Sequence, residues 1–131
     1  EISHHYGQEK FDKFGLSMLT IHNELYCKKL LFLLPKQVHP KQYHKKKTET
    51  FFILFGKIEL TIIKNNNIVF KKHLKTGETF TIKPYEIHKF VCKSNKGSVI
   101  EELSTYSSVS DSFYVDKKIN NNLERKTFIS L

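Results

Sequence analysis

Apolar and polar residues alternate along much of the chain with the two-residue period of β-strands. The clearest case is residues 57–64, where Ile58, Leu60 and Ile62 alternate with polar or charged residues. Side chains of a strand point alternately to its two faces. The pattern therefore predicts a strand with one buried and one solvent-facing side.

Short apolar or aromatic segments elsewhere in the chain are bounded by turn residues, as strands are. They are residues 16–22, 25–34, 50–55, 68–74, 79–82, 87–92 and 98–103. The turns between them contain Asn and Gly, which tolerate the left-handed backbone region that tight turns require. Short strands at this spacing predict an all-β protein of the sandwich or barrel type.

We expect residues 1–131 to form one domain, because the length is that of a single domain and no repeat or linker divides the chain. Residues 1–15 are predicted to form an N-terminal arm with a short strand or helical turn, and residues 104–131 a loop and tail. No apolar run reaches transmembrane length and no signal peptide is visible. These features favour a cytoplasmic protein that does not bind membranes.

The net charge of +9 invites a nucleic-acid-binding interpretation. The basic residues, however, are scattered lysines with one arginine, Arg125, and they occur together with runs of Asn. We attribute this pattern to a biased coding composition and expect no specific binding of nucleic acid. Cys27 and Cys92 lack the spacing of metal ligands and are predicted to be free thiols in strands.

The stretch from Gln42 to Gly56 contains the strongest candidate chemistry, because it offers His44 and Glu49 just before a buried strand. Imidazole and carboxylate are preferred ligands of first-row divalent metals. In a strand, Gln42 and His44 would point to the same face, whereas Glu49 has the opposite parity. Glu49 can join His44 only if the chain bends within residues 45–48.

These residues carry a resemblance to the cupin family. Its first motif is His-x-His, three or four residues, Glu, six residues and Gly, and here Gln42, His44, Glu49 and Gly56 have that spacing. Its second motif runs from a glycine through a proline to a histidine. Gly77, Pro84 and His88 of this chain resemble this second motif. The chain departs from it in three ways: the proline is displaced by one position, the internal glycine is absent, and Cys92 stands where the family often has Asn. The resemblance implies a cupin-type antiparallel β-sandwich, or jelly roll.

The chain also resembles cupin domains attached to, or encoded beside, sialic-acid-type sugar synthases and, more distantly, D-lyxose ketol-isomerases. The matching segments are residues 26–30, 39–51, 101–104, 111–114 and 125–127. In those isomerases a divalent metal, commonly manganese, is held by three His and one Glu.

Applied to the matching positions of this chain, the ligand set of those isomerases implies that His44, Glu49 and His88 bind manganese or zinc. Gln42 stands where the group has its third His and could be a ligand or ordinary pocket lining. As a ligand, an amide oxygen binds a transition metal more weakly than imidazole does. His39 is a spare candidate, but we interpret it as structural because a residue before proline is conformationally restricted. His4, His5, His22 and His73 are interpreted as surface residues.

The same resemblance assigns catalytic roles to Lys47 and Glu102. Lys47 shares strand parity with Glu49, and a solvated lysine is the alternative interpretation. Glu102 lies on the opposite face of its strand from Glu101, and a carboxylate inside a sandwich requires a partner because charge is costly to bury unpaired. Three aromatic residues are expected to line the pocket or the core: Tyr43, Tyr85 and Phe90.

Two functions follow from these expectations. The first is a metal-dependent sugar isomerase or epimerase of sialic-acid-type carbohydrate metabolism, in which Glu102 moves a proton between adjacent carbons and Lys47 steadies the developing charge. The second is a sugar-binding or regulatory module of a sugar synthase that catalyses nothing itself. Either would bind a small sugar or sugar acid, and the resemblance implies a homodimer.

Overall fold

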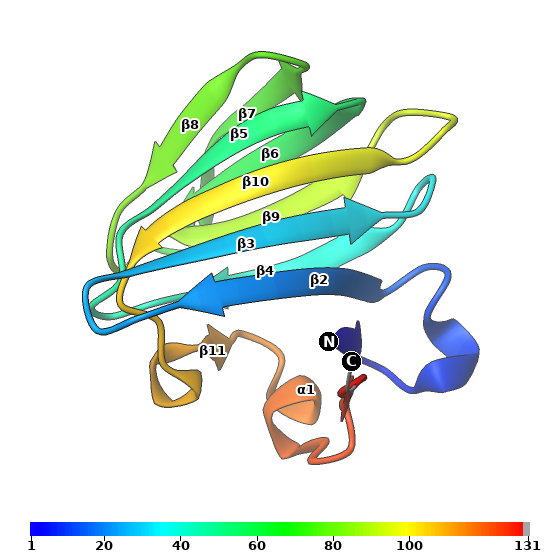
Figure 1. Cartoon of the computed structure of the whole chain (residues 1–131), viewed down its shortest axis with the longest axis vertical. Coiled ribbons are helices and arrows are strands. Elements are labelled where there is room, and N and C mark those ends of the chain that lie inside the picture. The colour runs from blue at the N-terminus through cyan, green and yellow to red at the C-terminus, as the bar shows by residue number, and fades with distance from the viewer. Residues whose placement is uncertain (130–131) are drawn as a thin grey trace.

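Two antiparallel β-sheets packed face to face form the protein, as a computed structural model that describes residues 1–129 shows (Figure 1). The seven-stranded sheet has the order β12 (Lys126–Thr127), β1 (Ile2–His4), β2 (Gly15–His22), β3 (Tyr26–Leu33), β10 (Ser98–Thr105), β5 (Glu49–Phe55) and β8 (Thr79–Ile82). The five-stranded sheet has the order β11 (Phe113–Tyr114), β4 (Val38–Tyr43), β9 (Ile87–Cys92), β6 (Lys57–Lys64) and β7 (Asn67–Lys75). The predicted jelly-roll sandwich is confirmed.

Helical structure in the described chain is limited to short pieces. These are two 3₁₀ turns, Gln8–Lys10 and Val109–Asp111, and the helix α1 (Lys117–Asn121). The central strands follow the predicted boundaries closely, and β8 and β9 match them at both ends. The sequence did not single out β4 as a separate strand, and it is this strand that leads into His44.

The hydrophobic core lies between the two sheets and is made of the residues that alternation predicts. Ile58, Leu60 and Ile62 of β6 are fully buried, and so are Ile53 of β5 and Ile100 of β10. Each such side chain contributes about 1.5–3 kcal/mol by leaving water. This packing fixes which face of β5, β9 and β10 points inward, and therefore fixes the direction of Glu49, His88 and Glu102 on the same strands.

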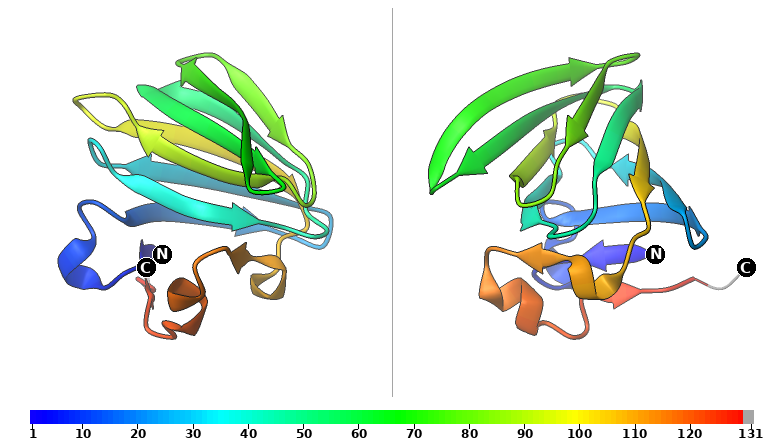
Figure 2. Two further views of the ribbon diagram at one scale, coloured as in Figure 1. Left: turned by 180° about the vertical axis from the view of Figure 1, so that it is seen from behind. Right: turned by 90° about the vertical axis from the view of Figure 1, so that its left-hand side faces the viewer.

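The two ends of the chain pair with each other beneath one side of the sandwich (Figure 2). Strand β1 pairs with β2 on one side and with β12 on the other. Strands of the expected N-terminal arm and C-terminal tail thus extend both sheets, because β1 and β12 join the seven-stranded sheet and β11 joins the five-stranded one. The interpretation of His4 and His5 as surface residues is wrong, because the returning tail covers them and leaves 5% and 1% of each exposed.

Gly56, which was expected to end a strand, lies in the tight turn between β5 and β6. Its φ of +82° belongs to the left-handed region, and a Cβ at this position would lie 2.5 Å from the carbonyl oxygen of Gly97. A side chain would therefore clash with the neighbouring turn, so glycine is required here.

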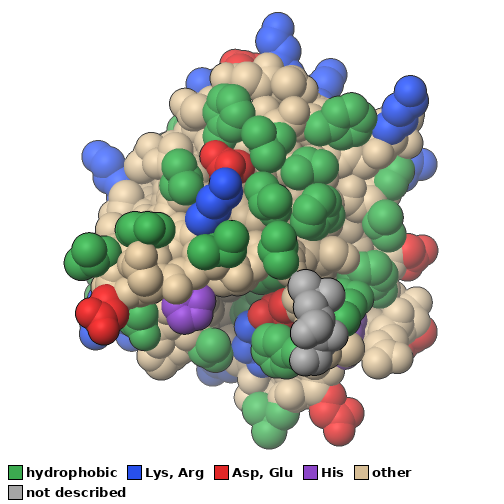
Figure 3. Space-filling model, viewed as in Figure 1, with side chains coloured by type: hydrophobic (Ala, Val, Ile, Leu, Met, Phe, Trp, Pro, Cys, Tyr) green, Lys and Arg blue, Asp and Glu red, His purple; other side chains and the backbone are tan. Residues whose placement is uncertain are grey.

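The outer face of the seven-stranded sheet is unusually apolar for a surface (Figure 3). Leu19, Ile21, Phe32, Leu54 and Leu103 are each at least 40% exposed there. Cys27 and Cys92 are free and buried within β3 and β9, as predicted. Within residues 1–129, no helix is long and apolar enough to cross a bilayer.

Candidate metal site and cavity

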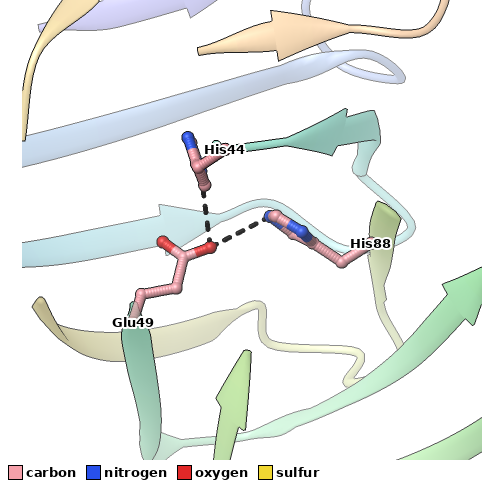
Figure 4. A group of neighbouring side chains, drawn as sticks. All are labelled: His44, Glu49 and His88. Atoms are coloured by element: carbon pink, nitrogen blue, oxygen red, sulfur yellow. Dashed lines mark ion pairs between the residues drawn. The ribbon is translucent and has the colours of Figure 1, made fainter. Parts of the chain in front are cut away.

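Three of the predicted metal ligands meet at one point inside the sandwich (Figure 4). His44 directly follows β4, Glu49 is the first residue of β5, and His88 lies in β9. One ligand atom from each lies within 4.8 Å of the others. Glu49 Oε1 is 3.0 Å from Nε2 of His88 and 3.5 Å from Nε2 of His44. All three side chains are buried.

The bend that brings Glu49 to His44 is fixed by Asp111, a residue to which the sequence assigned no role. The backbone N–H groups of Lys45, Lys46 and Lys47 donate to the Asp111 carboxylate at 2.9–3.2 Å. The predicted bend within residues 45–48 is therefore present. These three bonds lower the pKa of Asp111 even though partial burial opposes them.

Backbone carbonyls determine which nitrogen of each imidazole faces the site. Nδ1 of His44 lies 2.8 Å from the carbonyl oxygen of Asp111, and Nδ1 of His88 lies 3.0 Å from that of Glu86. Carbonyl oxygens only accept, so each Nδ1 must donate. In the neutral ring, Nε2 is then a lone-pair donor that faces Glu49, the usual arrangement of metal-binding histidines.

This arrangement fits a divalent metal ion. Two Nε2 lone pairs and Glu49 Oε1 converge, and Glu49 Oε1 is buried without a hydrogen-bond partner among the described residues. Three acceptors face to face repel one another unless a cation or a proton lies between them. Two imidazoles and one carboxylate are a donor set that suits manganese or zinc.

Without a metal, a proton compensates this repulsion. Burial lowers the pKa of His88, but its contacts with Glu49 outweigh burial and raise the pKa above the usual value. Burial likewise opposes ionisation of Glu49, yet Lys47 and the two imidazoles hold its pKa well below the ordinary range. The site therefore keeps a carboxylate ready for a cation.

Lys47 and Glu102, the two predicted catalytic residues, lie beside the three ligands. Lys47 Nζ is 3.1 Å from Glu49 Oε2 and 3.2 Å from Glu102 Oε2, and its side chain is 4% exposed. It is not a solvated lysine. The one ammonium group thus links the second oxygen of Glu49 to Glu102.

The charges of Lys47 and Glu49 influence the protonation of Glu102. Burial and the negative charge of Glu49 raise the pKa of Glu102, while Lys47 acts in the opposite direction. Burial disfavours the charge of Lys47, but the two carboxylates overcome it and raise the lysine pKa. A carboxyl group with raised pKa beside a fixed ammonium is better suited to proton transfer than an ordinary carboxylate.

The remaining candidates are divided between the cavity and its surroundings. Gln42 lies opposite His88 in the β4–β9 pairing and lines the cavity. His39 also lines it, but its ring stacks on Phe90 at 4.6 Å and does not belong to the group of three ligands.

Of the aromatic candidates, Phe90 lines the cavity, whereas Tyr43 stacks on Phe113 outside it. Tyr85 was expected in the pocket or core, but it sits in a turn with φ of +68° and is 65% exposed. His73 is exposed and pairs with Glu59, and His22 is also exposed, as interpreted from the sequence.

The cavity has a volume of about 430 Å³ and extends from the metal ligands to the covering tail. This volume falls in the range of small-molecule pockets, roughly 300–1,000 Å³. Tyr114 and Arg125 of the tail line it together with Ser3 of β1. Sequence reasoning missed this wall, although residues 111–114 and 125–127 were among the segments that carried the family resemblance.

Comparison with known proteins agrees with this architecture. The chain is 26% identical to the D-lyxose/D-mannose isomerase of Thermosediminibacter oceani, over 87% of this chain and 75% of that protein. It is 28% identical to the D-lyxose ketol-isomerase of a Thermofilum species, over 81% of this chain and 71% of the relative.

Among solved structures, the L-ribose isomerase of Cellulomonas parahominis with L-ribose is similar in fold. It superposes with a TM-score of 0.77 at 16% identity and covers 92% of this chain and 81% of that chain. The family model described as cupin domain matches residues 30–104, which include all the motif residues from Gln42 to His88 and also Glu102. The chain belongs to the cupin family.

Proposed function

We propose that this protein is a metal-dependent cupin enzyme that isomerises or epimerises a small sugar. One observation carries the proposal: two imidazole Nε2 atoms and a carboxylate oxygen converge beside a buried Lys47–Glu102 pair in a cavity of ligand size. The likeness to sugar isomerases supports a sugar substrate.

In this proposal His44, Glu49 and His88 hold the ion, with Gln42 as a fourth, weaker ligand. A bound manganese or zinc ion would polarise the sugar carbonyl as a Lewis acid. Asp111 and Glu86 orient the two imidazoles through their carbonyl oxygens. The chain itself thus supplies a site whose lone pairs are already directed inward.

Glu102 is proposed to move the proton between adjacent carbons of the open-chain sugar. Its carboxyl group is buried, and its pKa is raised chiefly by that burial. A raised pKa makes Glu102 a stronger base than an ordinary carboxylate, which suits it to take and return a proton. Lys47, fixed between Glu49 and Glu102, is proposed to stabilise negative charge that develops on the substrate oxygen.

Gln42 favours a second candidate function, a sugar-binding or regulatory module that catalyses nothing. An amide in place of the family's third imidazole weakens affinity for a transition metal. Residues 26–30 and 101–104 resemble cupin domains associated with sialic-acid-type sugar synthases. This resemblance suggests that either function belongs to sialic-acid-type carbohydrate metabolism. We propose that the protein acts there in the cytoplasm.

We further propose that the protein is a homodimer through the outer face of the seven-stranded sheet. Exposed apolar residues cover this face around the ion pair of Lys28 and Glu101, whose charged atoms are 3.1 Å apart (Figure 3). Contiguous apolar patches on a protein surface commonly mark interfaces. Sedimentation of the parent and of Phe32→Glu tests the dimer, because a charge at this position should give monomers.

A panel of neutral and acidic aldoses, incubated with manganese-loaded protein, tests the two functions against each other. The isomerase proposal predicts that at least one aldose is converted to its ketose or epimer, and that a chelator stops the conversion. Binding without conversion of any sugar would favour the module.

A further inference from the structure

The wall of the cavity beyond the metal ligands contains an arginine, Arg125, that forms no ion pair with a carboxylate of the described residues. Arg125 lines the cavity and lies just before β12. No carboxylate among residues 1–129 lies within ion-pair distance of it. The neighbouring Lys126, in contrast, pairs with Glu1 at 3.4 Å.

Packing holds the Arg125 side chain in place. Its Cζ lies 5.7 Å from the ring centre of Tyr114, and Nη1 donates to the carbonyl oxygen of Asn122 at 3.2 Å. The backbone carbonyl of Arg125 accepts from the N–H of His4. The guanidinium is thus preorganised, and its Nε is buried with no hydrogen-bond partner in the described part of the chain.

His39 supplies a second unpartnered polar group to the same cavity. It is 5% exposed, and its Nδ1 lacks a hydrogen-bond partner within residues 1–129. Stacking on Phe90 and the tilted contact with Tyr114, with ring centres 5.9 Å apart, fix the ring between the metal ligands and the tail. Buried polar atoms without partners are rare in proteins, and a missing ligand is one explanation.

Glu1, Glu49 and Glu102, the carboxylates that line the cavity, each already contact a lysine. Glu49 and Glu102 share Lys47, and Glu1 contacts Lys126. Arg125 therefore remains available for an anion that enters from outside. Arginine is well suited to this because its planar fork matches a carboxylate or phosphate with two parallel hydrogen bonds.

We propose that Arg125 and His39 form a second subsite, which binds a negatively charged substituent of the sugar whose other end lies at His44, Glu49 and His88. This inference rests on the proposed sugar-binding function and narrows its substrate to an acidic sugar, a carboxylate or a phosphate ester. One ligand can reach both subsites because both line the same cavity.

Calorimetric titration of the manganese-loaded protein with three related sugars tests the subsite without requiring turnover. The sugars are D-mannose, D-mannuronate and D-mannose 6-phosphate, which carry a neutral hydroxyl, a carboxylate and a phosphate ester at the same carbon, C6. We expect at least one of the two anions to bind about 10–100-fold more tightly than D-mannose, the effect of one or two charge-assisted hydrogen bonds. Which anion gains affinity distinguishes carboxylate from phosphate.

Variants assign the preference to Arg125. In Arg125→Gln the ratio of anionic to neutral affinity should fall to about the order of one, and in Arg125→Lys it should be intermediate, because lysine keeps the charge but loses the fork. Lys96→Gln removes the same charge from the exposed turn between β9 and β10 and should keep the parent ratio. Circular dichroism checks the fold, and Arg125→Lys decides the question if Arg125→Gln does not fold.

Three outcomes would overturn the proposal. If D-mannose binds and neither anion gains affinity, the second subsite is wrong while sugar binding stands. If Arg125→Gln retains the preference, or Lys96→Gln loses as much, the effect is not due to Arg125. If none of the three sugars binds, the proposed function fails together with this inference.

Discussion

The carbonyl oxygen of Asp111 lies 2.8 Å from Nδ1 of His44, although 67 positions of sequence separate the two residues. Its carboxylate also accepts from three backbone N–H groups of the following bend. One residue of the tail thus sets both the ring of His44 and the path of the chain to Glu49.

Asp111→Ala should weaken metal binding about 10–100-fold, as losses of outer-shell partners commonly do. The bend would lose its charged acceptor, and His44 and Glu49 would no longer be held together. Manganese titration followed by calorimetry measures the change. Asp116→Ala, which removes an acidic side chain outside the site, is the control. Equal affinities of Asp111→Ala and the parent would contradict the positioning role.

Lys47→Met should destabilise the metal-free fold by about 3–5 kcal/mol, because it removes the ammonium group that the two buried carboxylates Glu49 and Glu102 share. Urea unfolding in the presence of a chelator gives the free energy of unfolding. Lys46→Met, one position away and exposed, should change it by less than about 0.5 kcal/mol. A loss for Lys47→Met as small as that of Lys46→Met would show that the buried ion pairs do not stabilise the fold.

Gln42→His should raise affinity for manganese or zinc, because it restores an imidazole at the position opposite His88. The increase should be about tenfold or more, given that one additional good ligand contributes more than about 1.4 kcal/mol. Parallel titrations of the parent and the variant measure it. Unchanged affinity would mean that Gln42 lies away from the ligand position.

Metal affinity should rise with pH, because the metal must displace the proton that His88 binds in the metal-free site. Contact with Glu49 raises the pKa of His88 despite burial, so competition by protons persists to a higher pH than for an ordinary histidine. Below that pKa the apparent affinity should increase up to about tenfold per pH unit. Titrations from about pH 5.5 to about pH 8 check this. An affinity that is flat across the range would argue against His88 as a ligand.

Local patterns were sufficient to predict an all-β sandwich or barrel, because alternation in β6 and the turn residues indicate strands. The three converging ligands, His44, Glu49 and His88, were predicted from the resemblance to the two cupin motifs. The need for a bend before Glu49 follows from strand parity alone. Glu102 was placed on the inward face by the same argument together with the family resemblance, and its strand pairs with β3 and β5 so that it faces the cavity.

Other features depend on contacts between distant segments and have no local signal. Asp111 reaches the bend from more than 60 positions away, and no spacing rule relates the two. His4 and His5 are buried because the tail returns to cover them, and Nε2 of His5 contacts the hydroxyl of Tyr114 across 109 positions. Arg125 likewise enters the cavity only because β12 pairs with β1.

The most direct test of the account compares sugar conversion by the manganese-loaded parent with that by Glu102→Gln. The amide keeps the shape of Glu102 but cannot transfer a proton, so kcat should fall by about 10²–10⁴-fold. Manganese affinity, measured on the same samples, should remain within a few-fold of the parent value, because Glu102 is not among the three ligands. Two results would contradict the proposal that Glu102 transfers a proton in a sugar isomerase or epimerase. One is a Glu102→Gln variant that converts the sugar at the parent rate, and the other is a metal-loaded parent that binds sugars and converts none.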